Sequence, residues 1–204
     1  MHRLRSHKLS INRLWKELSR ILILEDLRGI ELEQRLVSKR IYEGRILNLR
    51  VDEVKLENGS LAKREVVEHP GAAAIVPILD RSEVLLVRQY RYPIGAELLE
   101  IPAGTLKANE DPKVCAVREL EEETGYLCRE ISRIAECFVA PGYSSEKIHI
   151  YLAKELTKTK TNMDEDESIA IERHKFTEAL DKIRTGEIRD AKSIVGLHVA
   201  AALL

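Results

Sequence analysis

A run of acidic residues between two glycines constrains this chain more than any other feature. Residues 104–126 read GTLKANEDPKVCAVRELEEETGY, with five glutamates inside fourteen residues. The stretch predicts a helix, because Asp111 is a good N-cap, Pro112 suits the first helical position and Gly125 is placed to end it. Like charges three or four residues apart on a helix cost about 0.2–0.5 kcal/mol per pair. A function that needs these carboxylates together would explain why the repulsion is tolerated.

The spacing of the glutamates favours a cation site on one face of this helix. Glu119 and Glu123 are four residues apart and share a face, and Glu122 lies at its edge. Ligands that are all oxygen suit Mg²⁺ or Mn²⁺ better than zinc. Gly104 allows a tight backbone turn before the helix, which would bring the carbonyl of Ala103 toward the same cations. We therefore expect Ala103, Glu119 and Glu123 as metal ligands.

The order of these residues resembles the complete Nudix box. That motif is a glycine, five residues, a glutamate, seven residues, arginine-glutamate, an apolar residue, one residue, two glutamates, one residue, a glycine and an apolar residue. A solvated acidic helix face is the ordinary interpretation of a glutamate run, and this spacing disfavours it. The resemblance implies an α+β fold, a Nudix-type α/β/α sandwich with a mixed sheet. It also implies hydrolysis of a nucleoside diphosphate linked to another group, with cations on the box binding the pyrophosphate and activating water. Arg118 is expected to hold Glu110 or a neighbouring carboxylate in place.

Segments on both sides of the box resemble the ADP-ribose pyrophosphatase branch of that family, over about residues 38–200. They read REVVEHPGAAAIVP, VRQYRYPIGAELLEIPAGTL and APGYSSEKIHIYLA, and Pro141 stands fifteen residues after Tyr126, as the marker proline of the branch does. The resemblance implies Mg²⁺-dependent hydrolysis of ADP-ribose to AMP and ribose 5-phosphate. The same chemistry on another nucleotide sugar, such as GDP-mannose, stays open. A non-catalytic module that senses a nucleotide is disfavoured, because such modules generally lose carboxylates of the box.

Three residues in these segments are candidates for substrate binding. Arg91 resembles the arginine that contacts the substrate phosphates, and Arg64 is a second candidate. Glu100, just before the IPAG turn, is a candidate either for a substrate contact or for packing of the turn. His69 and His149 have no nucleophile or second ligand at a telling spacing, so we interpret both as structural.

The general base should be a carboxylate that is not fully committed to a cation. The acidic loop MDEDES, residues 163–168, follows the last of these segments as the catalytic loop of the branch does. Matched onto that loop, Glu165 and Glu167 are expected as the base and an orienting group. Glu122 and Glu146 are the next candidates.

The remaining patterns divide the chain into an N-terminal helical extension, residues 1–38, and a catalytic domain, residues 39–204. About the first 34 residues carry apolar side chains at helical spacing and lie outside the resemblance. In the branch, N-terminal strands, here about residues 40–70, form a homodimer and complete the adenine site of the partner. Tyr42 is the one aromatic candidate for adenine stacking in the corresponding segment.

Short-range signals predict the other elements. The period changes to two from about residue 40, and Asn58-Gly59 signals a hairpin. Several apolar strands follow, and two helices, about 177–185 and 190–203, close the chain.

Composition narrows the choice of partners. A formal net charge of −1 argues against nucleic-acid binding. The partners that the resemblance implies are a nucleotide-sugar substrate and a second copy of the chain. No apolar run approaches the roughly 18–20 residues of a membrane span, so no membrane partner is expected. Three cysteines without metal-ligand spacing are typical of reduced thiols, and we predict a cytoplasmic protein.

Overall fold

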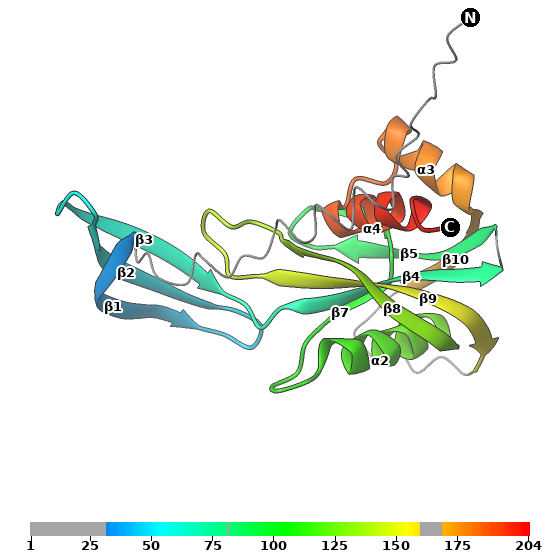
Figure 1. Cartoon of the computed structure of the whole chain (residues 1–204), viewed down its shortest axis with the longest axis horizontal. Helices are drawn as coiled ribbons and strands as arrows, with labels where there is room; N and C mark the ends of the chain where they lie inside the picture. The colour runs from blue at the N-terminus through cyan, green and yellow to red at the C-terminus, as the bar shows by residue number, and fades with distance from the viewer. Residues whose placement is uncertain (1–31, 81, 160–168) are drawn as a thin grey trace, which may run out of the picture.

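The computed structural model describes residues 32–80, 82–159 and 169–204. They form a mixed β-sheet between helices, with a smaller sheet beside it (Figure 1). Helix α2 (Pro112–Thr124) covers one face of the main sheet, and α3 (Phe176–Thr185) and α4 (Ala191–Ala201) cover the other. The α+β sandwich expected from the resemblance is confirmed. None of the helices in these described ranges is long and apolar enough to cross a bilayer.

Seven strands build the main sheet. They are β4 (Ala72–Asp80), β5 (Glu83–Arg91), β6 (Ala96–Glu100), β7 (Ala103–Thr105), β8 (Tyr126–Phe138), β9 (Lys147–Lys158) and β10 (Ile169–Lys175). Their spatial order is β10-β5-β4-β9-β8, with β6 paired to β5 and β7 paired to β4. The β4–β9 pair is parallel and the others are antiparallel, so the sheet is mixed. A parallel pair needs a crossover, and the chain between β4 and β9 includes α2.

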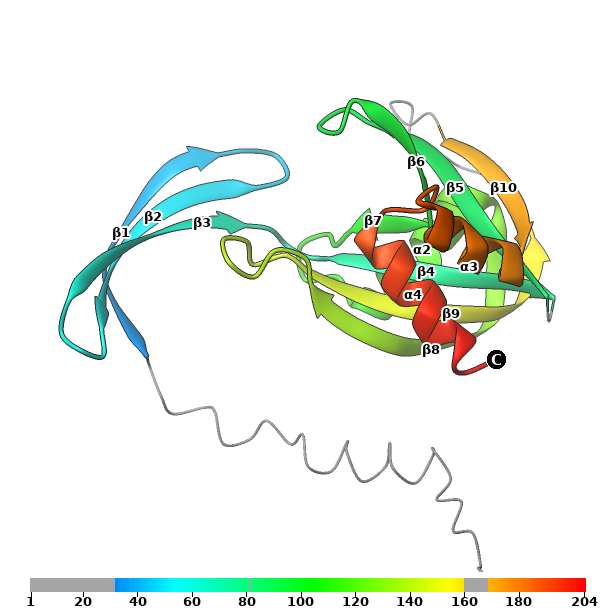
Figure 2. The ribbon, with the colours of Figure 1, turned by 90° about the horizontal axis from the view of Figure 1, so that it is seen from above.

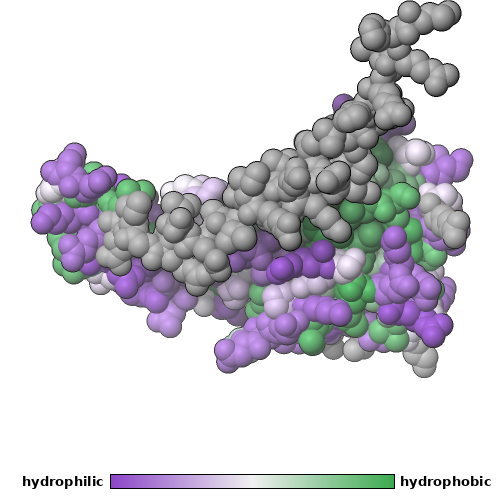
Figure 3. Space-filling model, in the orientation of Figure 1, coloured by the Kyte–Doolittle hydropathy of each residue, from purple (hydrophilic) through white to green (hydrophobic). Residues whose placement is uncertain are grey.

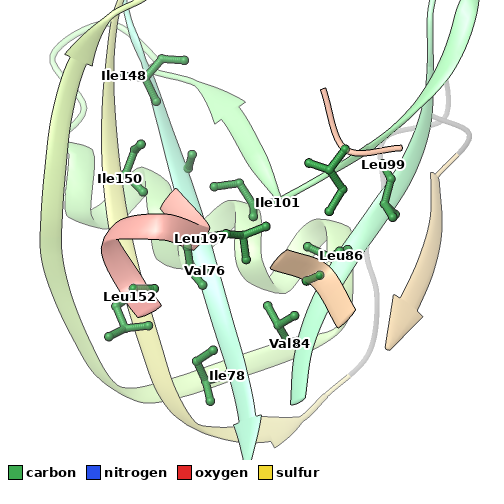
Figure 4. Close-up of a cluster of buried hydrophobic side chains, with 14 of the residues drawn as sticks. Val76, Ile78, Val84, Leu86, Leu99, Ile101, Ile148, Ile150, Leu152 and Leu197 are labelled. Atoms are coloured by element: carbon green, nitrogen blue, oxygen red, sulfur yellow. The ribbon is translucent and has the colours of Figure 1, made fainter. Parts of the chain in front are cut away.

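Strand β4 is central because helices bury both of its faces. Its nearly continuous apolar sequence, AAAIVPIL, is typical of a strand covered on both sides. On one face, Ile75 belongs to a buried cluster with Leu120 of α2. On the other, Val76 belongs to the cluster that includes Leu197 of α4 (Figure 4). Helix α4 lies close to the sheet at Gly196, where an added Cβ would stand 3.1 Å from a methyl carbon of Val76.

A three-stranded antiparallel sheet stands apart from the main body (Figure 2). It consists of β1 (Glu33–Glu43), β2 (Asn48–Leu56) and β3 (Leu61–Glu68), and β3 leads into β4. Gly59, with a φ of 82°, turns the chain between β2 and β3, which confirms the predicted hairpin. Every residue of β1 is exposed. Figure 3 shows apolar side chains among hydrophilic ones over this sheet, and its exposed large apolar residues are Leu36, Val37, Ile41, Tyr42, Ile46, Leu47 and Leu61.

The structure moves one predicted boundary. Strand β1 begins at Glu33, so residues 33–38 pair with β2 instead of belonging to the helical extension predicted for 1–38. The helical pattern of the earlier residues does not continue through residues 33–38, because pairing with β2 sets the conformation of that segment. The predicted helix within residues 1–31 and the acidic loop lie outside the described residues. The two C-terminal helices begin and end within two residues of their predicted bounds.

Candidate active site

Helix α2 begins and ends as its sequence predicts. The Asp111 carboxylate accepts hydrogen bonds from the N–H groups of Lys113 (2.8 Å) and Val114 (3.4 Å). Gly125 ends the helix in the left-handed region, with a φ of 68°. Leu120 is fully buried against the sheet. These contacts set both the position and the rotation of the helix, and so they set where its glutamates point.

The carboxylate of Glu119 lies directly against the backbone of Gly104 in β7. A Cβ atom built on Gly104 would stand 1.9 Å from both Cδ and Oε1 of Glu119, far inside van der Waals contact. Gly104 is not among the glycines with a positive φ. A side chain at this position would force the carboxylate to move, so glycine serves the close approach of Glu119, a different reason from the tight turn that the sequence suggested.

The guanidinium of Arg118 lies among three carboxylates. It donates hydrogen bonds to both oxygens of Glu110 (2.9 and 3.0 Å), to Glu122 (2.8 Å) and to Glu119. The hydrogen bonds from Arg118 lower the pKa of Glu110 from 4.5 to about 2. The same bonds to Glu110 raise the pKa of Arg118 above its usual range. Arg118 was predicted to hold Glu110 or a neighbouring carboxylate, and the structure shows that it holds Glu110 and two neighbours.

Glu123 stands one turn beyond Glu119 and is 2% exposed. Its Oε2 accepts a hydrogen bond of 3.0 Å from the N–H of Ala103. The three predicted metal ligands, Ala103, Glu119 and Glu123, are thus brought together where β7 meets α2.

These groups fit a hard divalent cation by their chemistry. Buried carboxylate oxygens beside a backbone segment are ligands that Mg²⁺ prefers, and a bound cation would offset the cost of burying their charge. Among the residues that the structure describes, no three acidic, histidine or cysteine side chains converge as a complete metal centre. The metal-ligand set therefore stays a prediction.

Two further predicted residues, Arg91 and Glu100, form a second group of charges, separate from the Arg118 cluster. Arg91 donates from Nε and Nη2 to both oxygens of Glu100, at 2.8 and 2.7 Å. Burial alone would raise the pKa of Glu100, which is 1% exposed, but the bonds from Arg91 and the charge of Lys192 hold that pKa below its usual value. The hydrogen bonds to Glu100 raise the pKa of Arg91. Pairing with Arg91 and Lys192 therefore compensates for the burial of the Glu100 carboxylate.

A cleft of about 370 Å³ opens beside the Arg91–Glu100 pair and the Ala103–Gly104 segment. Arg91, Glu100, Ala103 and Gly104 line it. Further lining residues are His69, Ala72, Pro93, Ile94, Leu98, Thr105, Val139, Glu146, Ile148, Asp190 and Lys192. The cleft thus has two cationic side chains, carboxylates and apolar side chains within one small volume.

Sequence reasoning missed several of the residues that line this cleft. His69, interpreted as structural, lines it, and its Nδ1 accepts a hydrogen bond from the N–H of Gly71 at 3.1 Å. Asp190 and Lys192, at the start of α4, were not singled out at all. The sequence did contain a signal for Lys192. A lysine in the first turn of a helix is unfavourable beside the positive end of the helix dipole, so its presence there suggests a specific anionic partner.

Two other predicted residues, Arg64 and Glu122, do not line the cleft of the single chain. Arg64, in β3, pairs with Glu33 of β1 on the small sheet, with its Nε 2.9 Å from a carboxylate oxygen. Glu122 stays beside the cluster, held by Arg118. Glu165 and Glu167 lie outside the described residues. The roles assigned to these four residues stay predictions.

A mixed sheet between helices, with a carboxylate-bearing helix behind the Ala103–Gly104 wall of a cleft, is typical of α/β/α sandwich hydrolases. The chain belongs to the Nudix family. The NUDIX domain model matches residues 68–195, and the model of the nucleoside diphosphate sugar hydrolase N-terminal domain matches residues 33–67.

Named relatives share most of their length with this chain. It is 41% identical to a methanol dehydrogenase activator of Bacillus methanolicus, over 81% of this chain and 91% of the relative. It is 38% identical to an ADP-ribose pyrophosphatase of Bacillus subtilis (strain 168), over 82% and 92%. A GDP-mannose pyrophosphatase of Shigella flexneri is 35% identical over 67% of this chain and 76% of its own. The crystal structure of an ADP compounds hydrolase superposes with a TM-score of 0.76 at 23% identity, covering 86% of this chain and 96% of the other, which shows the shared fold.

The close approach at Gly104 generates a first prediction. Replacing Gly104 with alanine should lower the free energy of unfolding by about 1–3 kcal/mol, since the added methyl group must displace the Glu119 carboxylate. Urea unfolding followed by circular dichroism measures this change. Gly142→Ala is the matched control, because nothing lies within 4 Å of a Cβ at that position, and it should stay within about 0.5 kcal/mol of the wild type. Equal stability of the two variants would contradict the packing described.

The Arg118–Glu110 pair generates a second prediction, on pH. The pKa of Glu110 is about 2 in the folded chain against 4.5 as its ordinary value, so the unfolded chain binds this proton first as pH falls. The stabilisation is fully present above about pH 4.5 and is lost as pH falls through about 2. Glu110→Gln should therefore flatten the loss of stability between pH 5 and pH 2.5, as measured by urea unfolding at each pH. Glu121→Gln, a change on α2 at a carboxylate to which Arg118 makes no hydrogen bond, should keep the wild-type slope. An unchanged slope in Glu110→Gln would refute the pairing.

Proposed function

We propose that this protein hydrolyses the pyrophosphate bond of ADP-ribose to give AMP and ribose 5-phosphate. The observation that carries the proposal is one cleft with Arg91 in its lining and the Glu119–Glu123 face of α2 behind its Ala103–Gly104 segment. A diphosphate needs both a cationic anchor and a charge-neutralising site. The Bacillus subtilis relative, named an ADP-ribose pyrophosphatase, supports the choice of substrate.

The proposed cofactor is Mg²⁺, with Mn²⁺ as a substitute, held by Glu119, Glu123 and the carbonyl of Ala103. When bound, such a cation neutralises charge on the diphosphate and lowers the pKa of an attacking water. The chain itself prepares this site. Arg118 holds Glu119 and Glu122 by hydrogen bonds, and the N–H of Ala103 orients Glu123.

The roles of the other residues follow from where they stand. Arg91, paired with Glu100 through Nε and Nη2, is proposed to bind the diphosphate with the remaining part of its guanidinium. The general base is proposed to come from the acidic loop, as Glu165 or Glu167. Glu122 is the alternative, although its bond to Arg118 commits one of its oxygens.

The same chemistry on GDP-mannose is the second candidate. A GDP-mannose pyrophosphatase is a relative, but it matches 67% of this chain, against 82% for the Bacillus subtilis protein. A module that only senses nucleotides is a weaker candidate, because every carboxylate of the box is present. A cytoplasmic location is proposed from the three free cysteines.

We also propose that the protein works as a homodimer through the small sheet. Strand β1 is an open edge that is exposed along its whole length, and large apolar side chains lie exposed around it. An open strand edge can pair with another chain, and contiguous exposed apolar side chains mark interaction sites. In such a dimer, Arg64 and Tyr42 would reach substrate across the subunit boundary, which is the role proposed for them.

Catalysis generates a third prediction. Wild-type protein with Mg²⁺ should turn over ADP-ribose with a higher kcat/KM than GDP-mannose, NADH or ADP-glucose, measured by chromatography of the products. Glu123→Gln should lower kcat at least about a hundredfold, because an amide cannot neutralise a divalent cation. Glu121→Gln is the control on the same helix and should stay within about threefold of the wild type. A tenfold preference for another substrate would reassign the substrate, and full activity of Glu123→Gln would remove the metal role.

The small sheet generates a fourth prediction. Sedimentation velocity should show a dimer for the wild type and a monomer for the double variant Val37→Glu/Ile41→Glu, since both side chains are about half exposed in the single chain. Leu203→Glu, exposed to 57% near the C-terminus, is the control and should remain a dimer. Deletion of residues 1–31 should leave both the dimer and its activity intact. A monomeric wild type would overturn the proposal.

A further inference from the structure

The start of helix α4 lines the cleft and contacts a buried carboxylate there, Glu100. Asp190, the N-cap of α4, accepts hydrogen bonds from the N–H (3.0 Å) and the hydroxyl (2.6 Å) of Ser193. The Ser193 hydroxyl oxygen in turn accepts a bond of 2.8 Å from the N–H of Ile101. The start of α4 is thereby joined to the segment that follows Glu100.

Lys192 lies beside these hydrogen bonds and contacts two carboxylates. Its Nζ contacts Oε2 of Glu100 and lies 3.0 Å from a carboxylate oxygen of Asp190. The lysine side chain is 9% exposed and that of Glu100 is 1% exposed, yet both line the cleft. Charges so deeply buried persist only when they are paired, so the ammonium and the two carboxylates depend on one another.

Counting the charges shows what the lysine contributes. Arg91 and Lys192 carry two positive charges, and Glu100 and Asp190 carry two negative charges, so the four groups are balanced. Without Lys192, two carboxylates would share one guanidinium, and the group would carry a net charge of −1. Arg91 already uses its Nε and Nη2 on Glu100, so its charge would be fully committed there.

We propose that Lys192 is a positioning residue for substrate binding: by neutralising Glu100 and Asp190 it leaves the charge of Arg91 available to the diphosphate. This proposal rests on the proposed function, because it assigns the anion to the substrate of that same cleft. It differs from a direct phosphate contact, since the ammonium is turned toward the two carboxylates. It also differs from a purely structural anchor, which would act on stability without acting on anion affinity.

Three variants of the full chain separate these possibilities. Lys192→Met removes the charge and keeps most of the volume, and Lys192→Arg keeps the charge. The double variant Lys192→Met/Asp190→Asn restores the balance between Arg91 and Glu100, and asparagine remains a good N-cap for α4. Lys182→Met is the matched control, because Lys182 of α3 pairs with Glu187, beyond the end of that helix, at 2.6 Å and does not line the cleft.

Steady-state hydrolysis of ADP-ribose is measured for each variant at low and high NaCl, together with its thermal unfolding. Lys192→Met should raise KM by about five- to tenfold while kcat changes less than about threefold. High salt should shrink this difference, because ions screen the repulsion between the cleft and the anion. Lys192→Arg should keep the wild-type KM, the double variant should regain most of it, and Lys182→Met should leave it unchanged.

The outcomes that overturn the proposal are distinct from failure of the proposed function. A wild-type KM in folded Lys192→Met overturns it, as does a raised KM that neither salt nor the double variant reduces. If the wild type hydrolyses no nucleoside diphosphate sugar, the proposed function fails. In that case, calorimetry with inorganic pyrophosphate decides the inference, and equal affinity of the wild type and Lys192→Met overturns it.

Discussion

The guanidinium of Arg118 makes it possible for α2 to carry its carboxylates side by side. It binds Glu110 before the helix and both Glu119 and Glu122 within it, so the repulsion among these groups is offset at one point. Because the Arg118 guanidinium pairs with it, the Glu119 carboxylate can pack against the backbone of Gly104, and α2 can lie close to β7. The position of the proposed metal site follows from this one contact between a helix and a strand.

The short segment from Glu100 to Gly104 connects the two faces of the sheet. At its beginning, Glu100 and Ile101 bond to Lys192 and Ser193 of α4, on one face. At its end, the N–H of Ala103 bonds to Glu123 of α2, on the other. A shift of either helix would therefore move this segment, which lines the cleft. The packing of the core thus affects the geometry of the proposed active site.

The small sheet contributes little to the core of the single chain, and it carries the exposed surface on which the proposed dimer depends. Strand β1 is exposed throughout, while β4, which continues the chain beyond β3, is among the most buried segments. Membership in the Nudix family rests on residues 68–195, and residues 33–67 match a separate N-terminal model. The proposed chemistry and the proposed assembly thus belong to neighbouring parts of one chain.

Sequence alone predicted the features that depend on neighbouring residues. The caps of α2 at Asp111 and Gly125 and the hairpin at Gly59 were predicted because each is decided within a few residues of the backbone. The pairing of Arg118 with Glu110 was predicted as well, since a helix and the turn before it bring these two residues together. The beginning of β1 at Glu33 was not predicted, because it depends on pairing with β2.

By itself the sequence determined the acidic helix, the order of its carboxylates and the family to which they belong, because these are properties of a continuous stretch of chain. Only the tertiary structure decided that Gly104 is needed for contact with Glu119 and that Glu100 is neutralised by Lys192, ninety-two residues later. Those contacts arise when α2 and α4 pack on opposite faces of one sheet. No spacing along the chain encodes the distance between side chains that meet in this way.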